Sequence, residues 1–178
     1  RAVEIVNIHG GTVTAIGGNS GGAGIGSGGG DANNYAYSGG TINIEGGRVT
    51  ATGGQYGAGI GGGYKGAGCY TTISGGTVAA TGMGGAWDIG RGYNSTSTSY
   101  VPKFIGGSIR PGTSAVYPRP TNGSATVAYV VWPGFAPGEP VVFPASGSGL
   151  PDNYGTHDIV ADEAGCIYLW FPNARDKT

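Results

Sequence analysis

The sequence predicts an all-β fold, a right-handed parallel β-helix of three strands per coil with about three to four coils. A glycine-rich unit recurs along the chain, each unit alternates apolar and polar residues as strands do, and the apolar positions match from unit to unit. The first glycine of each central pair is Gly10, Gly46, Gly75 and Gly106, so the spacings are 36, 29 and 31 residues. Right-handed connections between parallel strands are strongly preferred, which sets the expected hand.

Each unit contains three short segments that end or centre on an apolar residue. Inward side chains of one segment should stack on those of the next unit, and paired glycines should form the corners, where the backbone turns sharply. We therefore expect Ile44 to lie between Ile8 and Ile73. The three expected inward columns are Ile8, Ile44, Ile73 and Phe104; Val13, Val49, Val78 and Ile109; and Ile25, Ile60 and Ile89.

The polar positions of the second segment point outward in this scheme. One outward column contains Thr12, Arg48 and Thr77. Arg48 interrupts the flat rank of threonines that an ice-binding β-solenoid needs, which makes that alternative the weakest that we consider. Glu45 and Arg48 flank one glycine corner and are expected to form an exposed ion pair or to remain solvated.

Composition restricts the class of protein. The 178 residues include 41 glycines, only 11% are charged, and the net charge is −1. Without a basic patch, nucleic acid is not an expected partner. No apolar stretch reaches the 18 or more residues of a membrane span. The strand pattern starts almost at once, at Val3–Ile8, so we expect upstream coils of a parent chain to cover that edge.

Two phrases of the repeats, ISGGTVAATG at Ile73–Gly82 and GAGIGGG at Gly57–Gly63, resemble glycine-rich repeats of secreted or cell-surface proteins of Gram-positive bacteria. The tail at Tyr154–Pro172 is similar to segments that follow such repeats. The resemblance implies an extracellular or cell-surface β-helical module of an adhesin-like or carbohydrate-associated protein. It carries no catalytic signature and transfers no site residues.

From Pro111 onward the prolines gather and the glycine pairs end, which divides the chain into a β-helix at 1–112 and a β-rich C-terminal cap at 113–178. Strand-like runs flank the turn sequence DEAG at Asp162–Gly165, which predicts a hairpin. Four aromatic residues are candidates for a small core of the cap: Trp132, Phe143, Trp170 and Phe171. Cys69 and Cys166 either form one disulfide between the two parts or remain free thiols.

The segment Asp31–Gly40 is an insertion into the first coil. Inserted loops of solenoids are common binding elements. Tyr35 and Tyr37 are candidates for stacking on a sugar ring, and Asp31 is a candidate for binding its hydroxyls. The alternative, that the tyrosines cover the edge of the coil, is the interpretation that we favour.

The third coil breaks the repeat at AWDIGRG. Trp87 replaces Ala23 and Ala58, Asp88 replaces two glycines, and Arg91 replaces a serine or glycine. One hypothesis is a sugar-binding site made by Trp87, Asp88 and Arg91. The favoured hypothesis is structural: Trp87 fills space where the coils end, and Asp88 meets Arg91 or an N–H group at a strand edge.

The sequence contains no motif for catalysis, metal binding or a cofactor. A glycoside hydrolase needs two facing carboxylates, and the acidic residues of the repeats are scattered. The histidines, His9 and His157, have no companion at metal-ligand spacing. We therefore expect a non-catalytic module that acts as a rigid scaffold or binds a glycan or a host or cell-surface protein. The main alternative is a fragment of a β-helical polysaccharide-degrading enzyme.

Overall fold

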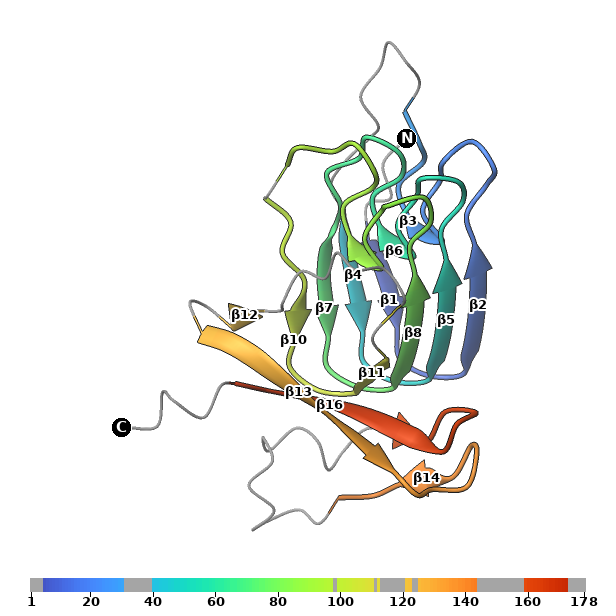
Figure 1. Ribbon diagram of the computed structural model, residues 1–178, viewed down its shortest axis with the longest axis vertical. Coiled ribbons are helices and arrows are strands. Elements are labelled where there is room, and N and C mark those ends of the chain that lie inside the picture. Colours follow the sequence, from blue (N-terminus) through green and yellow to red (C-terminus); the bar gives the residue numbers. More distant parts are fainter. Residues whose placement is uncertain are drawn as a thin grey trace.

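The computed structural model describes residues 5–30, 40–97, 99–110, 112, 121–122, 125–143 and 159–172. The regular elements in these residues are all β-strands (Figure 1). Strands up to Arg110 form three parallel sheets, and the strands after it form antiparallel sheets. The chain is therefore an all-β parallel β-helix followed by a smaller antiparallel region.

The first sheet collects the first strand of each coil in the order β1-β4-β7-β10. All neighbours pair in parallel, and the pairing brings Ile8, Ile44 and Ile73 into one row. The predicted position of Ile44 between the other two isoleucines is confirmed. The strands are β1 (Ile5–Ile8), β4 (Thr41–Ile44), β7 (Tyr70–Ile73) and β10 (Lys103–Phe104).

The second and third sheets repeat this arrangement, in the orders β2-β5-β8-β11 and β3-β6-β9. The fourth coil contributes a strand to the first two sheets only, so within the described residues the third sheet ends one coil earlier. The second sheet contains β2 (Thr12–Ile16), β5 (Arg48–Thr52), β8 (Thr77–Thr81) and β11 (Ser108–Arg110). The third contains β3 (Ile25–Gly26), β6 (Ile60–Gly61) and β9 (Ile89–Gly90).

The core lies inside the three sheets and consists of the predicted columns. Ile44, Ile60 and Ile73 are fully buried, and they belong to one cluster that extends from the first to the fourth coil. Alternation in the strands directs one side chain of every two inward, so each coil buries its apolar residues against the coils beside it. Which hand the β-helix has stays a prediction.

Glycines form the corner between the first and second sheets. Gly47 has a φ of 84°, and its equivalents Gly11, Gly76 and Gly107 have values of 78°, 76° and 81°. A side chain at Gly47 would also lie 2.5 Å from the carbonyl oxygen of Gly11 on the neighbouring coil. Both the left-handed backbone and the close stacking of coils therefore require glycine here.

The antiparallel region lies beneath the parallel sheets in Figure 1, with β13 and β16 running side by side. Its sheets have the orders β12-β13-β16 and β14-β15. The predicted boundary between residues 112 and 113 stays a prediction, because residues 113–120 lie outside the described part. The strands are β12 (Thr121–Asn122), β13 (Ala125–Pro133), β14 (Pro140–Val141), β15 (Ile159–Val160) and β16 (Cys166–Pro172).

Trp170 of β16 joins the two regions. It is 5% exposed, belongs to the core cluster of the β-helix, and packs edge-on against Phe104 with ring centroids 5.3 Å apart. Its indole N–H donates to the carbonyl oxygen of Ile109 at 2.9 Å. The antiparallel region therefore covers the apolar residues of the fourth coil.

Three sequence-based expectations differ from the structure. The DEAG turn is present, with the Gly165 N–H bonded to the Asp162 carbonyl, but β15 pairs with β14 and β16 pairs with β13. The turn therefore redirects the chain from one sheet to the other, and the predicted hairpin is wrong. A turn signal specifies a local backbone shape and not the partners of the flanking strands.

The expected core of the cap is also wrong in part. Phe143 packs with Ile159, Ile167 and Leu169, and the half-exposed Trp132 ring lies beside it, with centroids 6.3 Å apart. Trp170 belongs to the β-helix core instead. Nothing is described of the Phe171 side chain. Aromatic composition identifies core candidates, but it cannot assign them to one of two adjacent cores.

The ion pair that was one of the two possibilities for Glu45 and Arg48 does not form either. The Glu45 carboxylate contacts His9 Nδ1 on the first coil, at 2.7 Å. Stacking aligns equivalent corners of neighbouring coils, so a side chain reaches the next coil more readily than it reaches around its own corner.

Candidate functional site

The third coil keeps the backbone of the repeat at its irregular residues. The Trp87 N–H bonds to the Arg91 carbonyl at 3.0 Å, as the N–H of Ala23 bonds to Ser27 at 2.9 Å and that of Ala58 bonds to Gly62 at 2.9 Å. Trp87 thus takes the place that alanine has in the first two coils. The third coil therefore differs from the first two coils in its side chains and not in its backbone.

Asp88 is buried at the end of the third sheet. In the first two coils the N–H groups of Gly17 and Gly53 bond to carbonyls of the following coil, at 2.8 and 2.9 Å. The equivalent N–H of Gly82 instead donates to Asp88 Oδ1 at 2.7 Å. The carboxylate therefore takes the place of a backbone carbonyl that the next coil does not provide, and it satisfies an N–H at the sheet edge.

The second carboxylate oxygen of Asp88 is buried and has no hydrogen-bond partner. Burial raises the pKa of this carboxyl, and the hydrogen bond from the Gly82 N–H partly opposes the shift. Gly112 lies against the carboxylate, since a side chain at Gly112 would overlap it. Asp88 is 2% exposed, so it is placed to end the sheet and not to meet a ligand at the surface.

Trp87 and Arg91 lie together but apart from that carboxylate. The Arg91 guanidinium is 4.6 Å from the centroid of the Trp87 ring, a cation–π contact. The ring covers Gly90, whose added Cβ would lie 2.6 Å from it. In the inner coils Gly26 and Gly61 have the next coil's backbone at this position, so Trp87 covers the end of the glycine column. The structure contains no ion pair between Asp88 and Arg91.

The other predicted binding residues, Tyr35, Tyr37 and Asp31, lie outside the described residues. Their proposed role in the inserted loop stays a prediction. The described loops contain another aromatic group that the sequence analysis missed: Tyr56 lies 5.2 Å from Tyr93 and 5.7 Å from Tyr64 between ring centroids.

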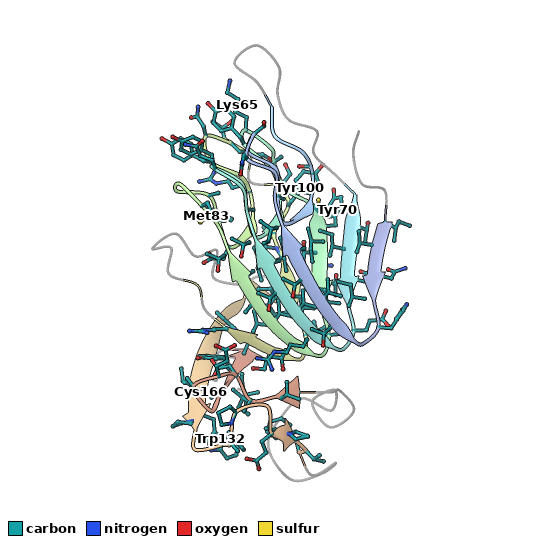
Figure 2. All side chains as sticks on the ribbon, turned by 90° about the vertical axis from the view of Figure 1, so that its right-hand side faces the viewer. Lys65, Tyr70, Met83, Tyr100, Trp132 and Cys166 are labelled. Atoms are coloured by element: carbon teal, nitrogen blue, oxygen red, sulfur yellow. The ribbon has the colours of Figure 1, made fainter. Side chains whose placement is uncertain are left out.

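These three tyrosines pack over glycine turns. The Tyr56 ring covers Gly84, and the Tyr93 ring covers Gly85. Tyr64 directly precedes Lys65, which Figure 2 labels at the end of the molecule away from the antiparallel region. We interpret the tyrosine group as packing that replaces the side chains missing from the glycine-rich loops.

A cleft of about 260 Å³ with polar and apolar lining residues lies on the outer face of the second sheet, where the Asp162–Cys166 turn passes over it. The cleft was not predicted, because it combines an outward column of the repeats with a distant turn. Its lining residues are Arg48, Val49, Thr50, Thr77, Val78, Ala79, Thr81, Arg110, Asp162, Glu163 and Tyr168.

Two contacts hold the turn against the sheet. Thr77 Oγ1 lies 2.9 Å from both the N–H and the carbonyl oxygen of Val160, so it accepts from the first and donates to the second. The Tyr168 N–H donates to Ser108 Oγ at 3.0 Å. These bonds join outward hydroxyls of β8 and β11 to the backbone of β15 and β16, which fixes the shape of the cleft.

Asp162 is the most constrained charge of the cleft. Its Oδ1 accepts from the N–H groups of Ala164 and Cys166 at 2.9 and 3.0 Å. Its Oδ2 accepts from the Tyr168 hydroxyl at 2.9 Å and lies 3.7 Å from Nη1 of Arg110. Burial alone raises the pKa of this carboxyl, but these hydrogen bonds and the guanidinium charge lower it more, so it lies below the ordinary value.

Tyr168 is held in its protonated form by the same arrangement. Burial and the hydrogen bond to Asp162 raise the pKa of its hydroxyl to about 12. Asp162 is therefore a carboxylate and Tyr168 a neutral donor at neutral pH. Arg48 differs, since its half-buried side chain lines the cleft without an ion pair in the described part of the chain.

Neither Cys69 nor Cys166 forms a disulfide in this structure. Cys69 is buried in the β-helix core, where burial raises its pKa to about 11. Cys166 lies in the antiparallel region (Figure 2). Among the described residues no three His, Cys, Asp or Glu side chains are grouped for a metal ion. Those residues also include no helix with the length and apolar character to cross a bilayer.

Comparison with known proteins supports the repeat. A family model described as a β-helix repeat matches residues 6–29, 42–64 and 72–86. The third match ends at Ala86, directly before the irregular Trp87 and Asp88. No curated protein and no solved structure matches the chain.

Proposed function

We propose that this β-helical region is a non-catalytic binding module of an extracellular or cell-surface protein, and that it binds a glycan bearing a carboxylate group in the cleft on the second sheet. The observation that carries the proposal is Arg48, a guanidinium that lines the cleft with no anionic partner in the described chain. Guanidinium groups bind carboxylates through paired hydrogen bonds. The adjacent threonine and tyrosine hydroxyls and the Glu163 carboxylate suit the hydroxyls of a sugar.

The size of the cleft supports a small ligand or one unit of a longer chain. Its volume of about 260 Å³ lies just below the range of about 300–1,000 Å³ that is usual for ligand sites. The stacked coils around it form a rigid support, since Val49 and Val78 beneath it are 1% and 0% exposed. Rigid support lowers the entropy cost of binding.

Two features favour binding over hydrolysis. A general acid in a glycosidase needs a raised pKa near its working pH, whereas the pKa of Asp162 is lowered. Asp88 does have a raised pKa, but it lies buried at the sheet end and not in the cleft. The resemblance of the repeats to those of Gram-positive surface proteins supports an adhesin-like setting.

Calorimetric titration with matched acidic and neutral oligosaccharides tests the proposal. We expect the acidic ligands to bind, and Arg48→Gln to weaken their binding by at least about tenfold, the effect of one lost charged hydrogen-bonded contact. Arg91→Gln is the matched control and should leave binding unchanged. It removes one guanidinium of the same kind from the alternative site beside Trp87.

Three results would contradict parts of the proposal. Loss of binding in Arg91→Gln but not in Arg48→Gln moves the site to Trp87. No binding of any ligand by the unmodified protein removes the glycan role and leaves a scaffold. Release of reducing ends or unsaturated sugars from polysaccharides restores the enzyme alternative.

A further inference from the structure

The first coil leaves one end of the β-helix core partly exposed, although Ile8 and Ile25 are each only 8% exposed. Val6, Val13 and Ala15 are only partly buried, whereas their equivalents in the second coil, Ile42, Val49 and Ala51, are at most 1% exposed. Figure 2 views the molecule from this end, with the strands of the first coil nearest the reader.

The same end presents backbone edges. The strands β1, β2 and β3 are each the outermost strand of their sheet. In the second coil the N–H groups of Glu45 and Arg48 donate to carbonyls of the first coil, at 2.8 and 2.7 Å. The corresponding N–H groups of the first coil belong to His9 and Thr12, and no strand of the described chain lies beyond them. Open edges of this kind pair readily with further strands.

The glycines at the three corners of the first coil indicate which kind of neighbour can stack on this end of the β-helix. Added Cβ atoms at Gly10, Gly18 and Gly28 would meet no described atom within 4 Å, and none of the three has a left-handed φ. Nothing in the described residues therefore requires glycine at these positions.

At the equivalent positions of the second coil, glycine is required by the first coil. The third coil keeps glycine at two of these positions, Gly75 and Gly92, and has Met83 at the third. A Cβ at Gly46 would lie 2.6 Å from the carbonyl oxygen of His9, and one at Gly63 would lie 2.5 Å from the carbonyl of Gly28. One at Gly54 would overlap the carbonyl of Gly18. The first coil thus has the glycines that a preceding coil demands.

We infer that this end is the docking surface for one further coil of the same glycine repeat, stacked in parallel and joined to the chain ahead of Ile5. Such a coil repeats the interface that already joins the first coil to the second and the second to the third. It would cover Val6, Val13 and Ala15 and bond to the open edges. A second copy related by a two-fold axis would reverse the strands and would not repeat the existing columns.

The test extends the protein by one coil. A copy of residues 41–69 is placed directly before Ile5, replacing the first four residues, because Thr41 pairs with Tyr70 as Ile5 pairs with Thr41. We expect a higher thermal midpoint than in the unmodified protein. Amide exchange at His9 and Thr12 should slow by at least about tenfold, since these groups become part of an inner ladder. A control extension with Asp at the copies of Ile42 and Ile44 should produce neither effect.

Glycine substitutions then test whether the added coil stacks on the first coil as the inner coils stack on each other. We expect Gly18→Ala to be tolerated in the unmodified protein and to lower the midpoint of the extended one, because only the added coil approaches Gly18. Gly54→Ala is the matched control and should destabilise both proteins. Equal effects of Gly18→Ala in both proteins, or an extension without any change in exchange, would overturn the inference.

The mass of the unmodified protein in solution shows whether a second copy of the chain covers this end of the β-helix. Sedimentation should give a monomer mass at low protein concentration. A stable dimer that Ile16→Lys dissociates would show that a second copy covers this end, and would overturn the inference. Neither this result nor the extension depends on ligand binding in the cleft.

Discussion

The two ends of the β-helix carry the same repeat but end in different ways. At the fourth coil, Phe104 and Ile109 are 7% and 0% exposed because Trp170 packs against them. At the first coil, Ile8 is 8% exposed, but Val13 is only partly buried, whereas its equivalent Ile109 in the fourth coil is fully buried. The difference shows that a repeat specifies stacking but not where stacking stops.

Ending the stack requires residues that depart from the repeat. Trp170 comes from a strand about 60 residues beyond the fourth coil and covers the apolar column. Asp88 binds the N–H of Gly82, directly after β8 of the second sheet, and Trp87 covers Gly90 at the end of the third sheet. Trp170 therefore replaces the apolar contacts that a further coil would make, and Asp88 replaces a hydrogen bond. These are the two interactions that every inner coil supplies to its neighbours.

Removing the cover should have the largest effect on stability. We expect Trp170→Ala to lower the free energy of unfolding by about 3–5 kcal/mol, the usual loss for a buried aromatic side chain. Its indole hydrogen bond to Ile109 is lost as well. Urea unfolding monitored by circular dichroism measures the change. Trp132→Ala is the control, because Trp132 is half exposed, and should cost about 1 kcal/mol or less. Equal losses in the two variants would show that Trp170 does not cover the core.

Comparing the same substitution at an inner coil and at the open end sharpens the contrast. Ile44→Ala should cost about 4 kcal/mol and Ile8→Ala about 2 kcal/mol, within the range of about 2–5 kcal/mol for this substitution. Ile44 has a coil on both sides, whereas Ile8 is 8% exposed and has a described coil on one side. The measurement is again urea unfolding. A loss at Ile8 as large as that at Ile44 would mean that the first coil is covered in solution.

The smallest expected effect concerns Asp88 and depends on pH. The folded-state pKa of this carboxyl is raised above its ordinary value of 3.8. Between these two values the folded protein holds more protons than the unfolded chain, so stability falls as pH increases through this window. Asp88→Asn keeps a carbonyl acceptor for Gly82 and has no charge, so this fall should disappear.

Asp88→Ala provides the second arm of that experiment. It removes the acceptor and should cost about 1–3 kcal/mol at pH 4, the penalty for leaving a buried N–H unpaired. Unfolding curves for the three proteins from pH 4 to pH 8 separate the two contributions. An Asn variant whose stability falls with pH as steeply as the parent would remove Asp88 as the cause.

The repeated region was predictable in detail from the sequence. Periodic apolar residues and paired glycines placed the three segments of each coil and the stacking of Ile44 between Ile8 and Ile73. The hypothesis that Asp88 meets an N–H group at a strand edge is confirmed. These features follow from the alternation of apolar and polar residues within each strand and from one contact that repeats between neighbouring coils. Both can be read from the sequence.

The cleft was not predictable in this way. Arg48 was seen as an outward residue and Asp162 as part of a turn, and 114 positions separate them in the sequence. Their meeting depends on the bonds from Val160 to Thr77 and from Tyr168 to Ser108. No periodicity encodes such contacts between the repeats and the antiparallel region.

What the sequence by itself determined is the β-helix, because each coil meets a near copy of itself and the same short pattern decides every interface. The tertiary structure alone decided which strand β15 pairs with, which core receives Trp170, and which charges line the cleft. These depend on single contacts between segments far apart in the chain. Their energies come from the shape and hydrogen bonding of one particular pair of surfaces, which no local pattern records.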